Sequence, residues 1–178
     1  MSFNVPNALT WMRIVMIPLF VGVFYFPPSW LAQPQQNLIA TVIFTTAALT
    51  DLLDGYLARK LNQVSAFGAF LDPVADKLIV AAALIVLVDL NRLNAVIAVI
   101  IIGREITISA LREWMALLGA AKSVAVSFIG KIKTVSQMVA IPMLLYHDAL
   151  RGFQPQQWGT GLILLAAALT LWSMFYYL

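Results

Sequence analysis

Four aspartates, the residue type most suited to binding hard metal ions, stand within an otherwise apolar stretch of the chain. An unpaired charge at bilayer depth costs about 2.5–3.5 kcal/mol, so carboxylates in such a stretch need cationic partners. Oxygen ligands alone suit two divalent cations such as Mg²⁺ or Mn²⁺, whereas zinc usually recruits Cys or His. The chain has no Cys, and its one His lies far from this stretch. The predicted metal ligands are Asp51, Asp54, Asp72 and Asp76.

Small residues accompany these carboxylates at helical spacing. At about 100° per residue, Gly55 and Ala58 share a helix face with the first two aspartates, and Arg59 lies at its margin. Gly68 lies one turn before Asp72. This arrangement leaves room for phosphates beside the metals, which is typical of phosphoryl-transfer chemistry. Two other interpretations stay open, a proton or ion pathway for the carboxylates and a simple helix cap at the Asp-Pro pair.

The full pattern from residue 51 to residue 76 reads Asp-x2-Asp-Gly-x2-Ala-Arg-x8-Gly-x3-Asp-x3-Asp. It resembles the signature of the CDP-alcohol phosphotransferase family, whose members are integral membrane enzymes. They move a phosphatidyl or similar group from a CDP-linked donor to an alcohol and release CMP. The resemblance implies that the four aspartates hold two metal ions and that Asp76 also acts as the general base. It further assigns Gly55, Ala58, Arg59 and Gly68 to the site that binds CDP-diacylglycerol.

The composition of the chain agrees with a membrane protein. Of its 178 residues, 62% are hydrophobic and only 11% are charged, and the mean hydropathy is +0.90. Such a chain is too apolar for an ordinary soluble domain, and no polar linker divides it. We therefore predict a single catalytic domain over residues 1–178, an all-α integral membrane protein with the lipid bilayer as its surroundings and no nucleic-acid partner.

Six apolar stretches predict six transmembrane helices, preceded by a short amphipathic N-terminal segment. Whether the third helix begins near Ser65 or at Pro73 stays open, since proline is accepted both inside a kinked helix and at a helix start. The predicted spans cover residues 11–26, 38–60, 73–90, 95–111, 131–146 and 158–177.

The basic residues indicate how these spans are oriented. All of them except Arg92 and Arg151 fall on the side of the aspartates, which the positive-inside rule makes the cytoplasmic side. An even number of spans puts both termini on that side as well. Together with the family resemblance, this predicts the bacterial cytoplasmic (inner) membrane as the location, with the active site facing the cytoplasm. The resemblance also implies a homodimer.

A polar string near the N-terminus has a second candidate role. Asn7, Thr10 and Arg13 recur every three residues, on one side of a possible helix. They could be a helix cap with two interfacial polar residues, or a lid over the aspartates. Because the string resembles the Asn-x-Leu-Thr-x-x-Arg of several bacterial family members, we expect Thr10 and Arg13 to bind the CDP-linked lipid.

A group of basic residues further along the chain could bind the second substrate. Arg suits bidentate recognition of phosphate, while Lys supplies a point charge. The same residues could instead set the topology and anchor headgroups, with Glu105 and Glu113 as their ion-pair partners. The segment 130–134 and the Arg-Glu pairs resemble the bacterial branch of the family whose acceptor is glycerol 3-phosphate. The predicted phosphate-binding residues are Arg104, Arg112, Lys131, Lys133 and Thr134.

The sequence is also compatible with two alternatives to this function. The same transfer could use another acceptor, namely inositol phosphate, serine or phosphatidylglycerol. A protein of a different class, a divalent-cation carrier, could also hold transported metal on the aspartates. A carrier would more often place its site at the midplane of the membrane, and it leaves the small residues and Arg59 unexplained.

Overall fold

The structure is a computed structural model whose regular elements are all helical in the part of the chain that it describes. It describes residues 5–61, 66–118, 128–149 and 152–177. For residues 5–9, 52–61, 66–70, 72, 128–129 and 174–177, only the course of the backbone is described. The elements are α1 (Val5–Gly22), a 3₁₀ turn η1 (Val23–Tyr25), α2 (Gln33–Leu61), α3 (Ala66–Asp89), α4 (Ala95–Leu117), α5 (Phe128–Tyr146) and α6 (Pro155–Tyr177).

The helix boundaries follow familiar local signals. Pro155 is the first residue of α6 and Pro34 is the second residue of α2, within the first turn, where the missing N–H of proline has no helical partner to lose. The side chain of Asn94 accepts a hydrogen bond of 2.8 Å from the backbone N–H of Val96 and so caps α4. The starts of α2, α4 and α6 therefore follow from residues in the sequence.

One expected boundary needs correction, and one boundary that the sequence leaves open is decided in favour of the start near Ser65. The N-terminal segment is not separate from the first helix, because α1 runs without a break from Val5, with Pro6 in its first turn. The third helix begins at Ala66 and carries Pro73 inside it, so the proline does not start the helix. By length and hydropathy, no helix qualifies as a membrane span within the described ranges.

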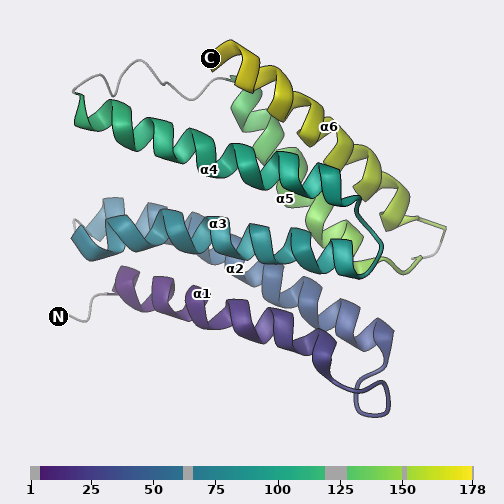
Figure 1. The fold of residues 1–178 in the computed structure, drawn as a ribbon. Coiled ribbons are helices and arrows are strands. Elements are labelled where there is room, and N and C mark those ends of the chain that lie inside the picture. The colour runs from purple at the N-terminus through teal and green to yellow at the C-terminus, as the bar shows by residue number, and fades with distance from the viewer. Residues whose placement is uncertain (1–4, 62–65, 119–127, 150–151, 178) are drawn as a thin grey trace.

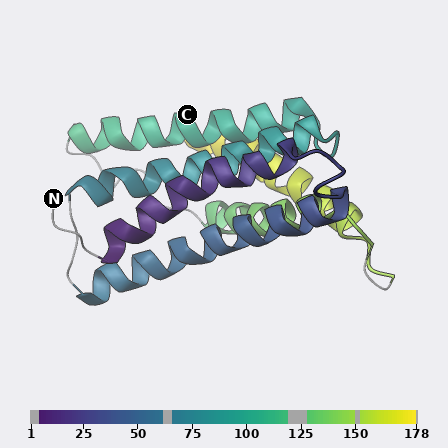
Figure 2. The same ribbon diagram turned by 90° about the horizontal axis from the view of Figure 1, so that it is seen from below.

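The six helices form a closed ring. Going round it, α1 contacts α2, α2 contacts α5, α5 contacts α6, α6 contacts α4, α4 contacts α3, and α3 returns to α1. Figure 1 shows α1, α3 and α4 stacked side by side, with α2 and α5 behind them, and Figure 2 shows the same bundle from below. Helices that follow one another in the chain run in opposite directions, so α1 begins and α6 ends toward the same end of the bundle (Figure 1).

The ring is filled differently in its two halves. Buried apolar side chains fill the half near the α3–α4 turn, among them Phe20, Leu84, Leu87, Ile101 and Ile141. Most of the buried polar and charged side chains, among them Arg13, Lys133 and Gln137, lie in the other half, toward the start of α3 and the end of α4. The apolar half thus holds the bundle together and leaves the polar half available for a site.

A polar cluster closes the apolar half at its far end. Arg92, in the turn after α3, donates hydrogen bonds to the carbonyl oxygens of Leu145 at 2.7 Å and Leu144 at 3.3 Å. It also donates to Oδ1 of Asn37 at 2.8 Å. One side chain therefore joins the start of α2, the α3–α4 turn and the end of α5. The carbonyls at a helix end need such partners.

Candidate active site

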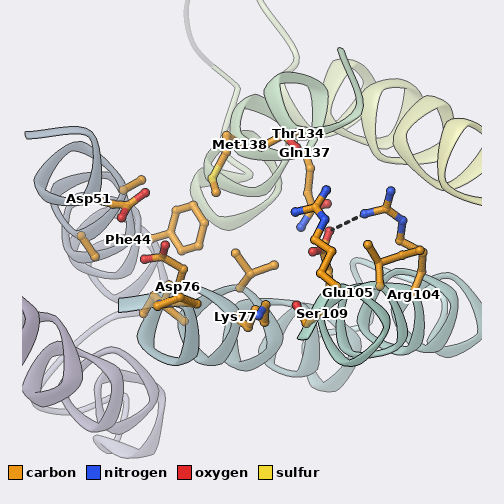
Figure 3. A pocket seen from close by; sticks show the side chains of 17 residues that line it. Phe44, Asp51, Asp76, Lys77, Arg104, Glu105, Ser109, Thr134, Gln137 and Met138 are labelled. Atoms are coloured by element: carbon orange, nitrogen blue, oxygen red, sulfur yellow. Dashed lines mark ion pairs between the residues drawn. The ribbon is translucent and has the colours of Figure 1, made fainter. Parts of the chain in front are cut away.

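A cavity of about 310 Å³ lies inside the polar half of the ring. Its walls come from α2, α3, α4 and α5, so four helices that are distant in sequence contribute to it. Figure 3 shows Asp51 and Asp76 on one side of this cavity and Arg104 and Glu105 on the other. Apolar side chains lie between them, including Phe44 and Met138 (Figure 3). The cavity therefore has an anionic side and a mainly cationic side.

The anionic side is held by a cation from the first helix. Nη1 of Arg13, on α1, lies 2.6 Å from Oδ1 of Asp76 and 3.3 Å from Oδ1 of Asp51. The Arg13 side chain is fully buried, while the two carboxylates are about one third exposed toward the cavity. Arg13 thus ties α1 to α2 and α3 at the point where the two carboxylates meet. Thr10, one turn earlier on α1, is buried as well.

For the other residues predicted on this side, the structure describes the backbone but not the side chains. Helices α2 and α3 carry them, but the positions of their side chains are not described. Within the described residues there is no group of three or more His, Cys, Asp or Glu side chains that could hold a metal ion. The residues concerned are Asp54, Gly55, Ala58, Arg59, Gly68 and Asp72.

The described part of the anionic side fits a hard divalent cation. Asp51 and Asp76 come from different helices, both line the cavity, and both contact the same guanidinium group. They present oxygen atoms alone, the ligands that Mg²⁺ and Mn²⁺ prefer. A further carboxylate from each helix, at the predicted spacing, would complete an oxygen-only set.

The cationic side brings together three of the five predicted phosphate-binding residues. Arg104, Arg112 and Thr134 line the cavity. Lys133 is buried, with 2% of its side chain exposed, and it stands behind Glu105 and not at the cavity wall. Lys131 is exposed and does not line the cavity either.

Glu105 organises two of these cations. Its Oε1 accepts a hydrogen bond from Nζ of Lys133 and lies 3.8 Å from Nη1 of Arg104. Nη2 of Arg104 also donates to Oγ of Ser173, on α6, at 3.3 Å. The expectation that Glu105 is an ion-pair partner of these cations is confirmed. The contacts join α4, α5 and α6 beside the cavity.

Gln137 is a site residue that the sequence reasoning missed. It lines the cavity from α5, and 4% of the residue is exposed. Among the described residues, its Oε1 has no hydrogen-bond partner, although a buried polar group without one is costly. A glutamine within the apolar stretch 135–146 was a signal that could have identified it. Nε of Arg104, on the opposite wall, likewise lacks a partner in the described part of the protein.

Comparison with known proteins identifies one family over nearly the whole chain. Residues 3–172 match the model of a family described as CDP-alcohol phosphatidyltransferase. A CDP-diacylglycerol–glycerol-3-phosphate 3-phosphatidyltransferase of Escherichia coli strain K12 is 50% identical over 184 residues. The protein of the same name from Salmonella typhimurium strain LT2 is 49% identical over 184 residues. Both alignments cover the whole of this chain and 94% of the relative. The chain therefore belongs to the CDP-alcohol phosphatidyltransferase family.

Proposed function

We propose that the protein is a phosphatidylglycerophosphate synthase, which transfers the phosphatidyl group of CDP-diacylglycerol to glycerol 3-phosphate and releases CMP. The observation that carries this proposal is the two-sided cavity, in which Asp51 and Asp76 face a group of cations that includes Arg104 and Arg112. One side suits a metal-bound diphosphate, and the other suits the phosphate of an acceptor. The names of the relatives from Escherichia coli and Salmonella typhimurium support the same pair of substrates.

On the donor side, Asp51, Asp54, Asp72 and Asp76 would hold two divalent cations, Mg²⁺ or Mn²⁺. When bound, such ions neutralise a diphosphate and stabilise charge on the attacking and leaving oxygens. Gly55, Ala58, Arg59, Gly68, Thr10 and Arg13 complete the proposed binding site for CDP-diacylglycerol, whose acyl chains remain in the bilayer.

On the acceptor side, Arg104, Arg112 and Thr134 bind the phosphate of glycerol 3-phosphate, with Lys131 and Lys133 as further positive charge. The carboxylate of Asp76 takes the proton of the acceptor hydroxyl, whose oxygen attacks the phosphorus that carries diacylglycerol. A new P–O bond forms to glycerol 3-phosphate, and the P–O bond to CMP breaks. Because both sides belong to one cavity, the acceptor hydroxyl and the diphosphate are held next to each other. Such positioning is the main contribution that a rigid site makes to this kind of transfer.

The same proposal places the protein in the bacterial cytoplasmic membrane as a single catalytic domain, with the active site and both termini facing the cytoplasm. Large apolar side chains on the outer face of the bundle support this location, because contiguous exposed apolar surface is uncommon on soluble monomers. Examples are Val15 and Leu19 on α1, Ile85 on α3 and Val99 on α4, which are 55–69% exposed. The family resemblance supports a homodimer.

The dependence of CMP release on the acceptor tests this function most directly. Purified protein in detergent should release CMP from CDP-diacylglycerol with Mg²⁺ and glycerol 3-phosphate, and release little with inositol phosphate, serine, phosphatidylglycerol or no acceptor. Equal release with serine would contradict the proposed acceptor. If protein that binds CDP-diacylglycerol releases no CMP with any of these acceptors, the synthase assignment is wrong, and divalent-cation flux into liposomes should be measured instead.

A further inference from the structure

Glu105 lies between a buried cation and the cavity. It lines the cavity with 28% of its side chain exposed, whereas Lys133, which it contacts, is 2% exposed and does not reach the cavity wall. Arg104 is close to the same carboxylate oxygen. Arg104 itself lines the cavity, but an anion that approaches Lys133 from the cavity meets the carboxylate first.

The arrangement creates a conflict of like charges. A phosphate and the Glu105 carboxylate cannot both occupy the space next to Lys133 and Arg104, because each disfavours the charge of the other. Lys133 cannot lose Glu105 without a replacement either, since an uncompensated buried charge is strongly unfavourable. The cations therefore hold one anion at a time, either the carboxylate or a substrate that replaces it.

A second hollow beside the cavity offers space for the Glu105 carboxylate when it leaves Lys133 and Arg104. A groove of about 190 Å³ between α3 and α4 is lined by Glu105 and Lys77, and the same two residues also line the main cavity. The other residues of the groove are apolar, for example Leu78 and Ile102. Figure 3 shows Lys77 on α3, between Asp76 and Glu105 along the wall of the cavity. Because Glu105 and Lys77 line both hollows, Lys77 is the cation available to the carboxylate on this side.

We propose that Glu105 determines acceptor specificity as a built-in counter-ion, which the phosphate of the acceptor displaces from Lys133 and Arg104 toward Lys77. The proposal rests on the proposed function, because it concerns the acceptor side of the same cavity. No covalent bond changes in this exchange. The phosphate takes over the charge compensation of two cations, and the carboxylate takes Lys77 as its new partner.

The exchange explains why a phosphorylated acceptor would be selected. A phosphate dianion replaces the charge of Glu105 and leaves Lys133 compensated. A neutral molecule such as glycerol, or a zwitterion such as serine, offers no comparable charge, so the carboxylate stays in place and fills the binding site. Discrimination thus comes from a group that repels the wrong acceptor as well as from the cations that attract the right one.

The test compares anion binding by the full-length protein in detergent, measured by titration calorimetry with inorganic phosphate and with glycerol 3-phosphate. Glu105→Gln removes the competing carboxylate, so both anions should bind with a Kd about tenfold lower than in the wild type. Glu113→Gln is the matched control, because Glu113 is exposed on the same helix and does not line the cavity. It removes the same charge and should leave both Kd values unchanged. An unchanged or higher Kd in Glu105→Gln overturns the proposal, and so does an equal gain in Glu113→Gln.

Glu105→Gln leaves Lys133 without its partner, so its folding is measured in the same samples. Inorganic phosphate should raise the Tm of this variant more than that of the wild type, and an equal increase contradicts the exchange. If the variant does not fold, Glu105→Asp replaces it, because the shorter carboxylate competes less well and should also lower both Kd values. Release of CMP by the wild type with glycerol 3-phosphate separates the two proposals. If that release occurs and the Kd values do not fall, only the role of Glu105 is wrong.

Discussion

Arg13 and Asp76 form a partly buried ion pair between the neighbouring helices α1 and α3, with 2.6 Å between Nη1 of the guanidinium and Oδ1 of the carboxylate. The two residues are 63 positions apart in the chain and lie on α1 and α3. Because the same nitrogen also lies 3.3 Å from Asp51, one side chain sets the separation of two carboxylates on different helices. The geometry of the donor side therefore depends on α1.

Replacing Arg13 should impair the chemical step more than lipid binding. Arg13→Gln removes the charge that holds the two carboxylates, and we expect kcat to fall by roughly a hundredfold, as small displacements of reacting groups can cause. Arg13→Lys keeps one charge without the fork of a guanidinium and should recover part of the loss. Steady-state CMP release at varied CDP-diacylglycerol measures both constants. A rise in KM for the lipid with kcat unchanged would leave Arg13 with donor binding alone and contradict its role in setting the two carboxylates.

The contact between α5 and α6 depends on a glycine. A Cβ atom at Gly159 would lie 2.9 Å from Cγ of Leu144 and 3.2 Å from the carbonyl oxygen of Ala140. Gly159→Ala should therefore lower the free energy of unfolding by about 1–3 kcal/mol, the usual effect of overpacking. Gly161→Ala, on the same helix with nothing within 4 Å of its added carbon, is the control. Equal Tm values for both variants would show that α6 shifts to accept the methyl group.

Arg92 should be needed for stability and not for catalysis. Arg92→Lys cannot serve two carbonyl oxygens and Asn37 together, so buried acceptors at the end of α5 lose their partner. We expect a loss of about 1–3 kcal/mol in the free energy of unfolding. The rate of CMP release measured well below the Tm should stay at the wild-type value, since the cluster lies at the opposite end from the cavity. A variant as stable as the wild type would contradict the tethering role.

His147, next to this cluster, should make stability depend on pH. Burial lowers the pKa of His147 below its ordinary value of 6.5 and Arg92 lowers it further, while Asp148 opposes the change. The unfolded chain therefore takes up this proton at a higher pH than the folded protein does. The stabilising effect is complete above pH 6.5 and is lost as the pH falls from there toward the lower folded pKa.

The measurement is the Tm between pH 7 and pH 5, which should fall more steeply for the wild type than for His147→Asn. Asn is chosen because it tolerates the positive φ of 61° at this position. Parallel curves for the two proteins would show that other groups cause the loss of stability in acid.

Much of the fold could be predicted from the sequence, because long apolar stretches separated by polar turns identify the helices. All six appear, with α4 starting at the predicted Ala95 and α5 ending at the predicted Tyr146. The first residue of α3 is harder to predict, since Pro73 is compatible with both the interior and the beginning of a helix. Local rules do not decide such a case, which depends on the packing of neighbouring helices.

The site was predictable in its residue types more than in its contacts. Spacing within each helix brought Asp51 on α2 and Asp76 on α3 into the proposal, but their ion pairs with Arg13 join three helices and leave no periodic trace. In the same way, the sequence suggests Lys133 as a phosphate-binding residue without showing its ion pair with Glu105. Contacts between distant segments depend on the ring of helices, which hydropathy does not encode.

The central claim is that phosphatidyl transfer occurs in this cavity, with Asp76 as the base. Its most direct test is the transfer of ³²P-labelled glycerol 3-phosphate into extractable lipid by the purified protein, with CDP-diacylglycerol and Mg²⁺. We predict that the wild type incorporates the label, that Asp76→Asn does not while still binding the donor, and that Asp89→Asn, on the same helix but exposed at its far end, behaves as the wild type. Undiminished incorporation by Asp76→Asn would contradict this account.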